Sequence, residues 1–192
     1  MQPSLLAAIG FAWLIWIAYW FVSATRTKQV ERTDNVGTIL AYRIPMMVGA
    51  VLLIATGPRT WLPWLWWRWL PASADWPVIG LALVLLGLAF ACWARVVLGR
   101  NWSATVQLKK EHELIVVGPY RWARHPIYTG MLLAMLGTAV AIGEWRGLLA
   151  IALVFAGLWF KLRHEEAWMR ERFGASYVDY MRRVKALIPG IL

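Results

Sequence analysis

The sequence is poor in the residues from which disulfides and metal sites are built. It contains one cysteine, Cys92, and three histidines, His112, His125 and His164, among 192 residues. A single cysteine excludes an internal disulfide and a metal site made of several thiolates. The histidines are dispersed and no H-E-x-x-H pair occurs, so no metal site is predicted.

Nucleotide-binding motifs and acidic residues are also scarce. The chain has neither a G-x-G-x-x-G turn nor a P-loop, which argues against soluble dinucleotide and nucleotide folds. No Ser-His-Asp set stands out. Only 10 acidic residues oppose 20 basic ones, so the net charge is +10. Because the basic residues lie at the ends of apolar segments rather than on one polar domain, a nucleic-acid partner is not expected.

Apolar side chains, by contrast, are abundant. Hydrophobic residues make up 60% of the chain, charged residues 16%, and the mean hydropathy is +0.55. A soluble domain usually has about 25% charged residues, so much of this surface must face lipid. We therefore predict an all-α, polytopic membrane protein with one membrane domain over residues 1–192. About five transmembrane helices are expected, at residues 5–22, 38–56, 78–98, 127–142 and 147–160.

The distribution of positive charge predicts how these spans are oriented. The first run is expected to be a retained span, because no basic region precedes it as in a signal peptide. The short 143–146 connection predicts that the last two spans form a helical hairpin. Five alternating spans place segments 23–37, 99–126 and 161–192 on one side, and these hold 15 of the 20 lysines and arginines. The positive-inside rule then predicts a cytoplasmic C-terminus, in a cell inner (plasma) membrane.

Polar and aromatic residues crowd the entrance of the fourth span, over residues 112–130. Pro126 suits the first turn of a helix, where its missing N–H costs nothing. His125 would then lie beside a helix N-terminus, where free N–H groups favour an anion such as a cofactor carboxylate. The same residues would also serve as an interfacial anchor at headgroup depth, so the residues alone leave both interpretations open.

This stretch also carries a family resemblance. Gly118-Pro119-Tyr120 followed by Arg124-His125-Pro126-x-Tyr128-x-Gly130 resembles the cofactor-binding signature of the isoprenylcysteine carboxyl methyltransferases, which are related to the phospholipid methyltransferases. The resemblance runs in order over about residues 100–189. Its flanking features are Asn101-Trp102, Gln107, His112-x-Leu114, Glu165-Glu166, Phe173-Gly174, Tyr177, Tyr180, Val184 and Ile188-Pro189.

The resemblance implies a site for S-adenosylmethionine, with S-adenosylhomocysteine as product. The methyl acceptor would be a lipophilic small molecule or a lipidated substrate, reached from the membrane lipid. Aromatic rings would cover the adenine or the sulfonium, and Glu165 would pair with the amino group of the cofactor. The cofactor-binding residues implied in this way are Gln107, His112, Glu113, Leu114, Ile115, Tyr120, His125, Pro126, Tyr128 and Glu165.

The acceptor end of the site departs from the family pattern. Family members place an arginine, which receives the substrate carboxylate, four residues before the matching glutamate. This chain has Lys161 there and Arg163 two residues later, and both are candidate ligands of the acceptor. Lysine keeps the charge but loses the bidentate fork. Lys161 shares a helix face with Glu165 by i,i+4 spacing. Arg43, inside the second span, is interpreted as an interfacial anchor rather than a ligand.

Several functions remain open from the sequence. The closest motif match favours O-methylation of a prenylcysteine-like carboxylate, which needs no general base because it is already ionised. A phospholipid amine N-methyltransferase would need a base such as Glu166 or His164. Two rival functions are an NADPH-binding protein similar to the sterol reductases and a non-enzymatic membrane protein. The ordered set of motifs argues against both of these rivals.

Overall fold

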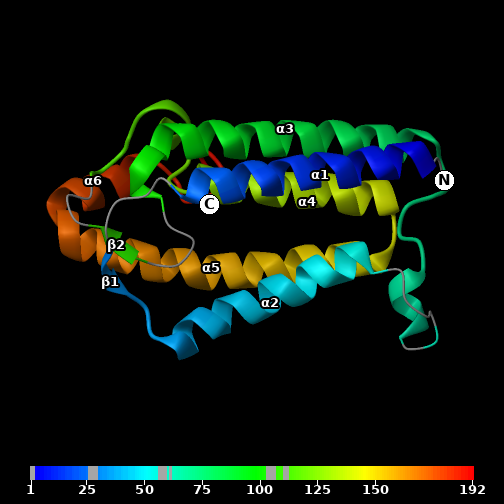
Figure 1. Ribbon diagram of the computed structural model, residues 1–192, viewed down its shortest axis with the longest axis horizontal. Coiled ribbons are helices and arrows are strands. Elements are labelled where there is room, and N and C mark those ends of the chain that lie inside the picture. The colour runs from blue at the N-terminus through cyan, green and yellow to red at the C-terminus, as the bar shows by residue number, and fades with distance from the viewer. Residues whose placement is uncertain (1–2, 26–29, 56–59, 61, 103–106, 110–112) are drawn as a thin grey trace.

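The computed structural model describes residues 3–25, 30–55, 60, 62–102, 107–109 and 113–192. Nearly all of them are helical or lie in short connections (Figure 1). The α-helices are α1 (Pro3–Ala24), α2 (Val36–Ile54), α3 (Asp75–Leu98), α4 (Pro126–Ile142), α5 (Trp145–Phe173) and α6 (Ala175–Arg183). Three 3-10 turns connect them, η1 (Pro63–Trp66), η2 (Gly99–Asn101) and η3 (Gly118–Arg121). The predicted all-α class is therefore confirmed.

The long helices form two layers. Figure 1 shows α1, α3 and α4 side by side in one layer and α2 with α5 in the other. Within the first layer, α3 and α4 approach so closely that a Cβ added at Gly87 would lie 2.5 Å from the Gly130 carbonyl oxygen. Gly80 meets Gly137 in the same way, one heptad away. Small residues at such a contact let two helix backbones pack where lipid supplies no hydrophobic driving force.

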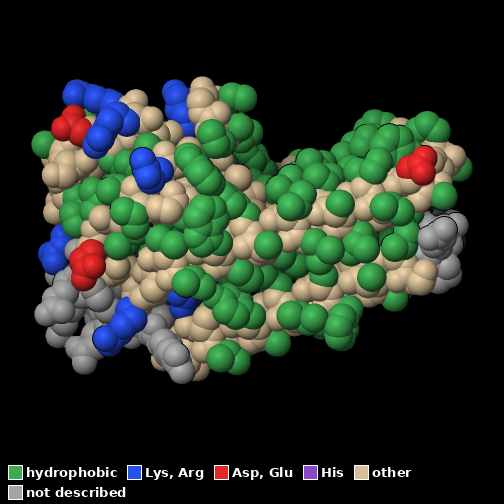
Figure 2. Space-filling model, turned by 90° about the horizontal axis from the view of Figure 1, so that it is seen from above, with side chains coloured by type: hydrophobic (Ala, Val, Ile, Leu, Met, Phe, Trp, Pro, Cys, Tyr) green, Lys and Arg blue, Asp and Glu red, His purple; other side chains and the backbone are tan. Residues whose placement is uncertain are grey.

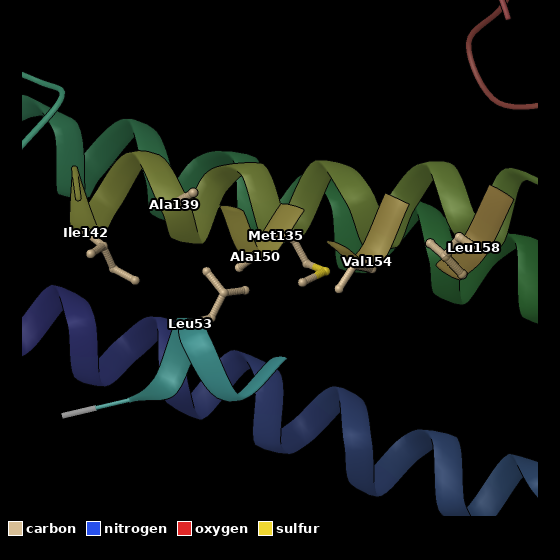
Figure 3. Packing of buried hydrophobic residues seen from close by; sticks show 7 residues of the cluster. All are labelled: Leu53, Met135, Ala139, Ile142, Ala150, Val154 and Leu158. Carbon is tan, nitrogen blue, oxygen red and sulfur yellow. The ribbon is translucent and has the colours of Figure 1, made fainter. Parts of the chain in front are cut away.

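The two helices of the second layer also pack closely through glycines. A Cβ at Gly157 of α5 would lie 2.6 Å from the Tyr42 carbonyl oxygen of α2, and one at Gly49 would lie 2.7 Å from that of Ala150. Apolar side chains fill the space between the layers. In Figure 3, Leu53 of α2 meets a cluster supplied by α4 and α5, namely Met135, Ala139, Ile142, Ala150, Val154 and Leu158.

The surface of the bundle has the character of a membrane protein. Four helices, α1, α2, α3 and α5, are long and apolar enough to cross a bilayer, and α4 is a shorter apolar helix of 17 residues. At 1.5 Å per residue α4 is about 25 Å long, somewhat shorter than a hydrocarbon core of about 30 Å. Figure 2 shows hydrophobic side chains along the middle of one face, with Lys and Arg gathered at the end that carries α6. The chain is a multi-pass membrane protein.

One feature was not expected from the sequence. A short antiparallel ribbon pairs β1 (Val30–Thr33) with β2 (Gln107–Lys109), with Thr33 opposite Gln107. It ties together two segments that were predicted to share one membrane side. The polar tail is predicted from the sequence to be helical at least until Phe173, and α5 does run on beyond residue 160 to Phe173.

The opposite end of the bundle is closed by a buried arginine. Arg146, at the start of α5, donates to the carbonyl oxygens of Leu52 at 2.7 Å and Ala55 at 2.9 Å, where α2 ends. It also pairs with Glu144 at 2.6 Å and lies over the Trp66 ring. These donors satisfy carbonyl groups that the end of a helix leaves without partners.

Candidate functional site

A cavity of about 130 Å³ lies at the polar end of the bundle. It is lined by the end of α3, by η2, η3 and residues 113–115, by the start of α4, and by α5 and α6. One water molecule needs roughly 10–15 Å³ by the same measure, so the cavity has room for part of a small molecule. Two stretches of the chain, residues 98–128 and 165–180, meet here because α4 and α5 form a hairpin that returns to the same end.

The start of α4 is fixed by the C-terminal segment. The backbone N–H groups of Arg124 and His125 donate to the carbonyl oxygens of Lys185 and Ala186, each at 2.9 Å. Thr129, one turn into α4, donates its hydroxyl to Leu187 O at 2.7 Å. His125 is the N-cap residue and Pro126 begins the helix, as the sequence predicted. Residues 185–187 thus hold the backbone that carries the His125 side chain.

Two adjacent glutamates on α5 take different partners. The Glu166 side chain is buried and accepts from Arg124 at 2.8 Å (Nε) and 2.6 Å (Nη2). Glu165 accepts from the Tyr128 hydroxyl, which lies 2.8 Å from each carboxylate oxygen. His125 stands between them, with Nε2 3.3 Å from Glu166 and Nδ1 3.5 Å from Glu165. Its ring also stacks on Tyr128, with centroids 5.4 Å apart.

Lys161 completes this row of charges. Its side chain is buried, its Nζ lies 3.4 Å from Glu165 Oε1, and it sits over the Tyr128 ring at 5.1 Å. With Arg124, Glu166 and the partly exposed Glu165 it forms a set of two cations and two carboxylates. Buried charges persist only when they are paired in this way.

The other walls of the cavity are aromatic. Tyr120, on η3, is buried. Its backbone carbonyl oxygen accepts a hydrogen bond from the hydroxyl of Tyr180, on α6, at 2.5 Å. Tyr177, also on α6, is buried against the same site. Burial raises the pKa of all three phenols above their ordinary value. They are therefore neutral at pH 7, and each hydroxyl keeps its proton.

We next compared the sequence and the fold with those of known proteins. A family model described as phospholipid methyltransferase matches residues 76–176, from α3 to the first residues of α6. The chain belongs to this methyltransferase family.

Several proteins that are similar to this chain in sequence are named isoprenylcysteine O-methyltransferases. Protein-S-isoprenylcysteine O-methyltransferase B of Arabidopsis thaliana is 30% identical over 113 residues, which are 57% of each chain. The Saccharomyces cerevisiae protein-S-isoprenylcysteine O-methyltransferase is 34% identical over 120 residues, 59% of this chain and 49% of that one. The chain thus spans about half to three fifths of the length of these relatives.

A solved structure shares the fold. The eukaryotic intramembrane Ras methyltransferase ICMT, isoprenylcysteine carboxyl methyltransferase, is 27% identical with a TM-score of 0.51. The match covers 80% of this chain and 51% of that one. The resemblance inferred from the sequence motifs is therefore confirmed.

The structure brings most of the predicted cofactor residues to one cavity. The predicted residues that line it are Glu113, Leu114, Ile115, Tyr120, His125, Tyr128 and Glu165. Pro126 is buried and starts α4 rather than lining the cavity. Gln107 lies in β2, where only its backbone is described, and His112 lies outside the described residues.

The two candidates for the acceptor ligand differ in position. Neither of them is among the residues that line the cavity, but Lys161 is buried against two that are, Glu165 and Tyr128, whereas Arg163 is exposed on α5. The helical repeat explains the difference, because residues two apart face different sides. Arg43 is exposed on α2, consistent with an anchor.

Other lining residues were absent from the predicted set. They are Leu98, Asn101, Trp102, Arg124, Ile127, Trp168, Met169, Tyr177 and Tyr180. Several of them stand in the matched motifs, so a signal was present in the sequence. Their role could not be assigned from it because α3 and α6 reach the cavity only through tertiary packing.

Proposed function

We propose that this chain transfers the methyl group of S-adenosylmethionine to a carboxylate on a lipophilic acceptor, of the prenylcysteine type. Three things support the proposal: membership of the methyltransferase family, similarity to isoprenylcysteine O-methyltransferases, and a buried lysine beside the cavity. The last of these is the observation that carries the choice of acceptor.

The residues of the cavity fit the proposed methyl donor. Its amino-acid end is zwitterionic, and the wall offers Glu165 for the ammonium group and the neighbourhood of His125 at a helix N-terminus for the carboxylate. Its sulfonium is a cation, which the faces of Tyr120 and Tyr128 would attract. When bound, this cofactor supplies an electrophilic methyl group on sulfur.

Lys161 fits the acceptor. Its ammonium is buried, and it lies next to Glu165, where the methyl donor would be bound. Lys161 lies over the Tyr42 ring of α2 and the Tyr128 ring of α4, so a lipid tail would run along apolar helices from a carboxylate held there. A carboxylate is already ionised at neutral pH, so its oxygen attacks the methyl carbon without a general base. Lys161 would hold the acceptor oxygen for this transfer, in which the O–CH3 bond would form as the S–CH3 bond breaks and a neutral thioether would be left.

Catalysis in this scheme is mostly positioning. Lys161 orients the acceptor oxygen, the aromatic walls exclude water, and Arg124 with Glu166 fixes the start of α4. We also propose that the end with α6 faces the cytoplasm of an inner (plasma) membrane, since 15 of the 20 lysines and arginines belong to segments on that side.

N-methylation of a phospholipid amine is the second candidate, because the matching family model describes phospholipid methyltransferases. An amine acceptor must lose a proton, and the nearest carboxylates are engaged by Arg124 and by Tyr128. The carboxylate acceptor is therefore the better fit. Family membership also argues against a reductase-like or a non-enzymatic function.

Calorimetry with S-adenosylhomocysteine tests the cofactor site. The purified protein should bind it, His125→Ala and Glu165→Ala should lose binding, and Asp179→Ala on the exposed face of α6 should retain it. A folded parent protein that binds none would refute the methyltransferase proposal.

Turnover tests the acceptor. An S-prenylated cysteine with a free carboxylate should be methylated, while its methyl ester and phosphatidylethanolamine should not. Lys161→Met should raise KM for the carboxylate, and Lys161→Arg should restore it. Methylation of phosphatidylethanolamine alone would instead establish the amine chemistry.

A further inference from the structure

Lys161, the proposed ligand of the acceptor, is flanked by the rings of two tyrosines from different layers of the bundle. Its Nζ atom lies 5.1 Å from the ring centroid of Tyr128, on α4, and 5.9 Å from that of Tyr42, on α2. The face of an aromatic ring attracts a cation electrostatically, and the attraction is stronger where water is excluded. Both rings therefore stabilise the buried ammonium without neutralising its charge.

Tyr42 differs from Tyr128 in its relation to the cavity. Tyr128 lines the cavity and donates its hydroxyl to Glu165. Tyr42 is not among the lining residues, and only 1% of its surface is exposed. A tyrosine that served as an interfacial anchor would keep its ring at the lipid headgroups, whereas this ring is turned into the bundle. It can therefore act on the acceptor through Lys161 without touching the proposed methyl donor.

Close packing of α2 on α5 fixes the place of the Tyr42 ring relative to the ammonium. A Cβ at Gly157 would lie 2.6 Å from the Tyr42 carbonyl oxygen, so the two backbones meet at this point. Lys161 is one turn further along α5, on the same face as Gly157 by i,i+4 spacing. The glycine thus lets α2 approach closely enough for its tyrosine to reach the lysine.

The ring matters most when the methyl donor is bound. Glu165 lies 3.4 Å from Lys161 Nζ, but it is also the proposed partner of the ammonium group of the donor. Once Glu165 is engaged there, the two tyrosine rings remain to hold the Lys161 ammonium. Because the rings carry no net charge, the positive charge stays available for the acceptor carboxylate.

We propose that Tyr42 is a positioning residue for the acceptor, because its ring holds the Lys161 ammonium against Tyr128 where the acceptor carboxylate is received. This inference rests on the proposed function, since it assumes that Lys161 binds the acceptor. It also brings α2 into the site, although the matching family model begins at residue 76.

Steady-state kinetics on the full chain in detergent, with an S-prenylated cysteine as acceptor, tests the role of the ring. Tyr42→Leu removes the ring and should raise KM for the acceptor roughly threefold to thirtyfold, the range expected for one buried cation–π contact. The dissociation constant of S-adenosylhomocysteine should not change. Tyr42→Phe keeps the ring and should keep the KM of the parent protein.

The outcomes separate this inference from the proposed function. A folded Tyr42→Leu protein with the KM of the parent would overturn the role of the ring and leave the methyltransferase proposal standing. An equal increase of KM in Tyr42→Phe would also overturn it, because the hydroxyl would then be the group that matters. A parent protein that does not methylate the carboxylate would overturn both.

Two comparisons distinguish positioning from loss of packing. Leu53→Ala, in the core near the other end of α2, should lower the apparent Tm but leave KM for the acceptor unchanged. In a Lys161→Met background, Tyr42→Leu should add nothing to KM, because the ring acts through the ammonium. Additive increases of KM would contradict the inference.

Fluorinated phenylalanines at position 42 provide a test that preserves the shape of the ring, and so the fold. Fluorine withdraws electron density from the ring face and weakens its attraction for a cation. KM for the acceptor should rise stepwise in variants that carry one, two and three ring fluorine atoms. A KM that is the same throughout the series would overturn the inference.

Discussion

The buried ion pair between Arg124 and Glu166 should matter far more for stability than its exposed counterpart on α6. The two side chains are 9% and 6% exposed and their atoms approach to 2.6 Å. Removing one partner of such a pair leaves a buried charge uncompensated, which costs about 3–5 kcal/mol. Glu166→Gln keeps one acceptor oxygen for the guanidinium, so we take the lower end, about 3 kcal/mol.

This loss is large enough to measure by thermal unfolding in detergent. For a chain of this size about 1 kcal/mol corresponds to roughly 2–4 °C, so Glu166→Gln should lower the apparent Tm by at least about 6 °C. The matched control is Asp179→Asn. It breaks the ion pair between Asp179 and Arg182. The Arg182 side chain is 76% exposed and the Asp179 side chain is 60% exposed. Water screens that pair, so the Tm should change by less than about 2 °C.

The difference between the Tm shifts of the two variants tests whether the buried pair stabilises the protein. Equal shifts for Glu166→Gln and Asp179→Asn would show that the Arg124–Glu166 pair does not hold the start of α4. S-adenosylhomocysteine binding should also weaken in Glu166→Gln, because the His125 ring loses the carboxylate 3.3 Å from its Nε2.

Three further outcomes are expected. Gly87→Leu should cost about 3 kcal/mol or more, seen as a lower apparent Tm, because the added side chain meets the backbone of α4 at 2.5 Å. Gly10→Leu, where nothing lies within 4 Å, should cost little, and equal effects would contradict the close packing of α3 on α4. Arg146→Met should lower the apparent Tm by several degrees but leave the S-adenosylhomocysteine dissociation constant unchanged, since it removes donors only at the far end of the bundle. Burial raises the pKa of Tyr180 above 10.0, so unfolding releases a proton at high pH, and the stability present below pH 10 should fall as the pH rises further. Tyr180→Phe should make this alkaline loss of apparent Tm less steep, and an unchanged profile would contradict the assignment.

Much of the architecture follows from composition and from short patterns. Long apolar runs must become helices in lipid, because the bilayer offers no partner for backbone N–H and C=O groups. Helices α1 to α5 therefore each contain one of the predicted apolar runs or nearly all of it, and α5 continues well past residue 160. Pro126 marks the start of α4 for a local reason, its missing donor. The ordered motifs around Tyr120 and His125 were specific enough to indicate the family, and most of the residues that they implied line one cavity.

Tertiary packing decided what no local pattern could. The β1–β2 ribbon joins segments that are far apart in the chain, as in the pairing of Thr33 with Gln107, and neither strand shows a clear alternation in the sequence. Lys161 is buried and Arg163 exposed because of which face of α5 turns inward, toward α2 and α4. The sequence thus determines the helices and the motif, because both depend on neighbouring residues. The tertiary structure determines which side chains meet, because those contacts depend on how separate helices pack.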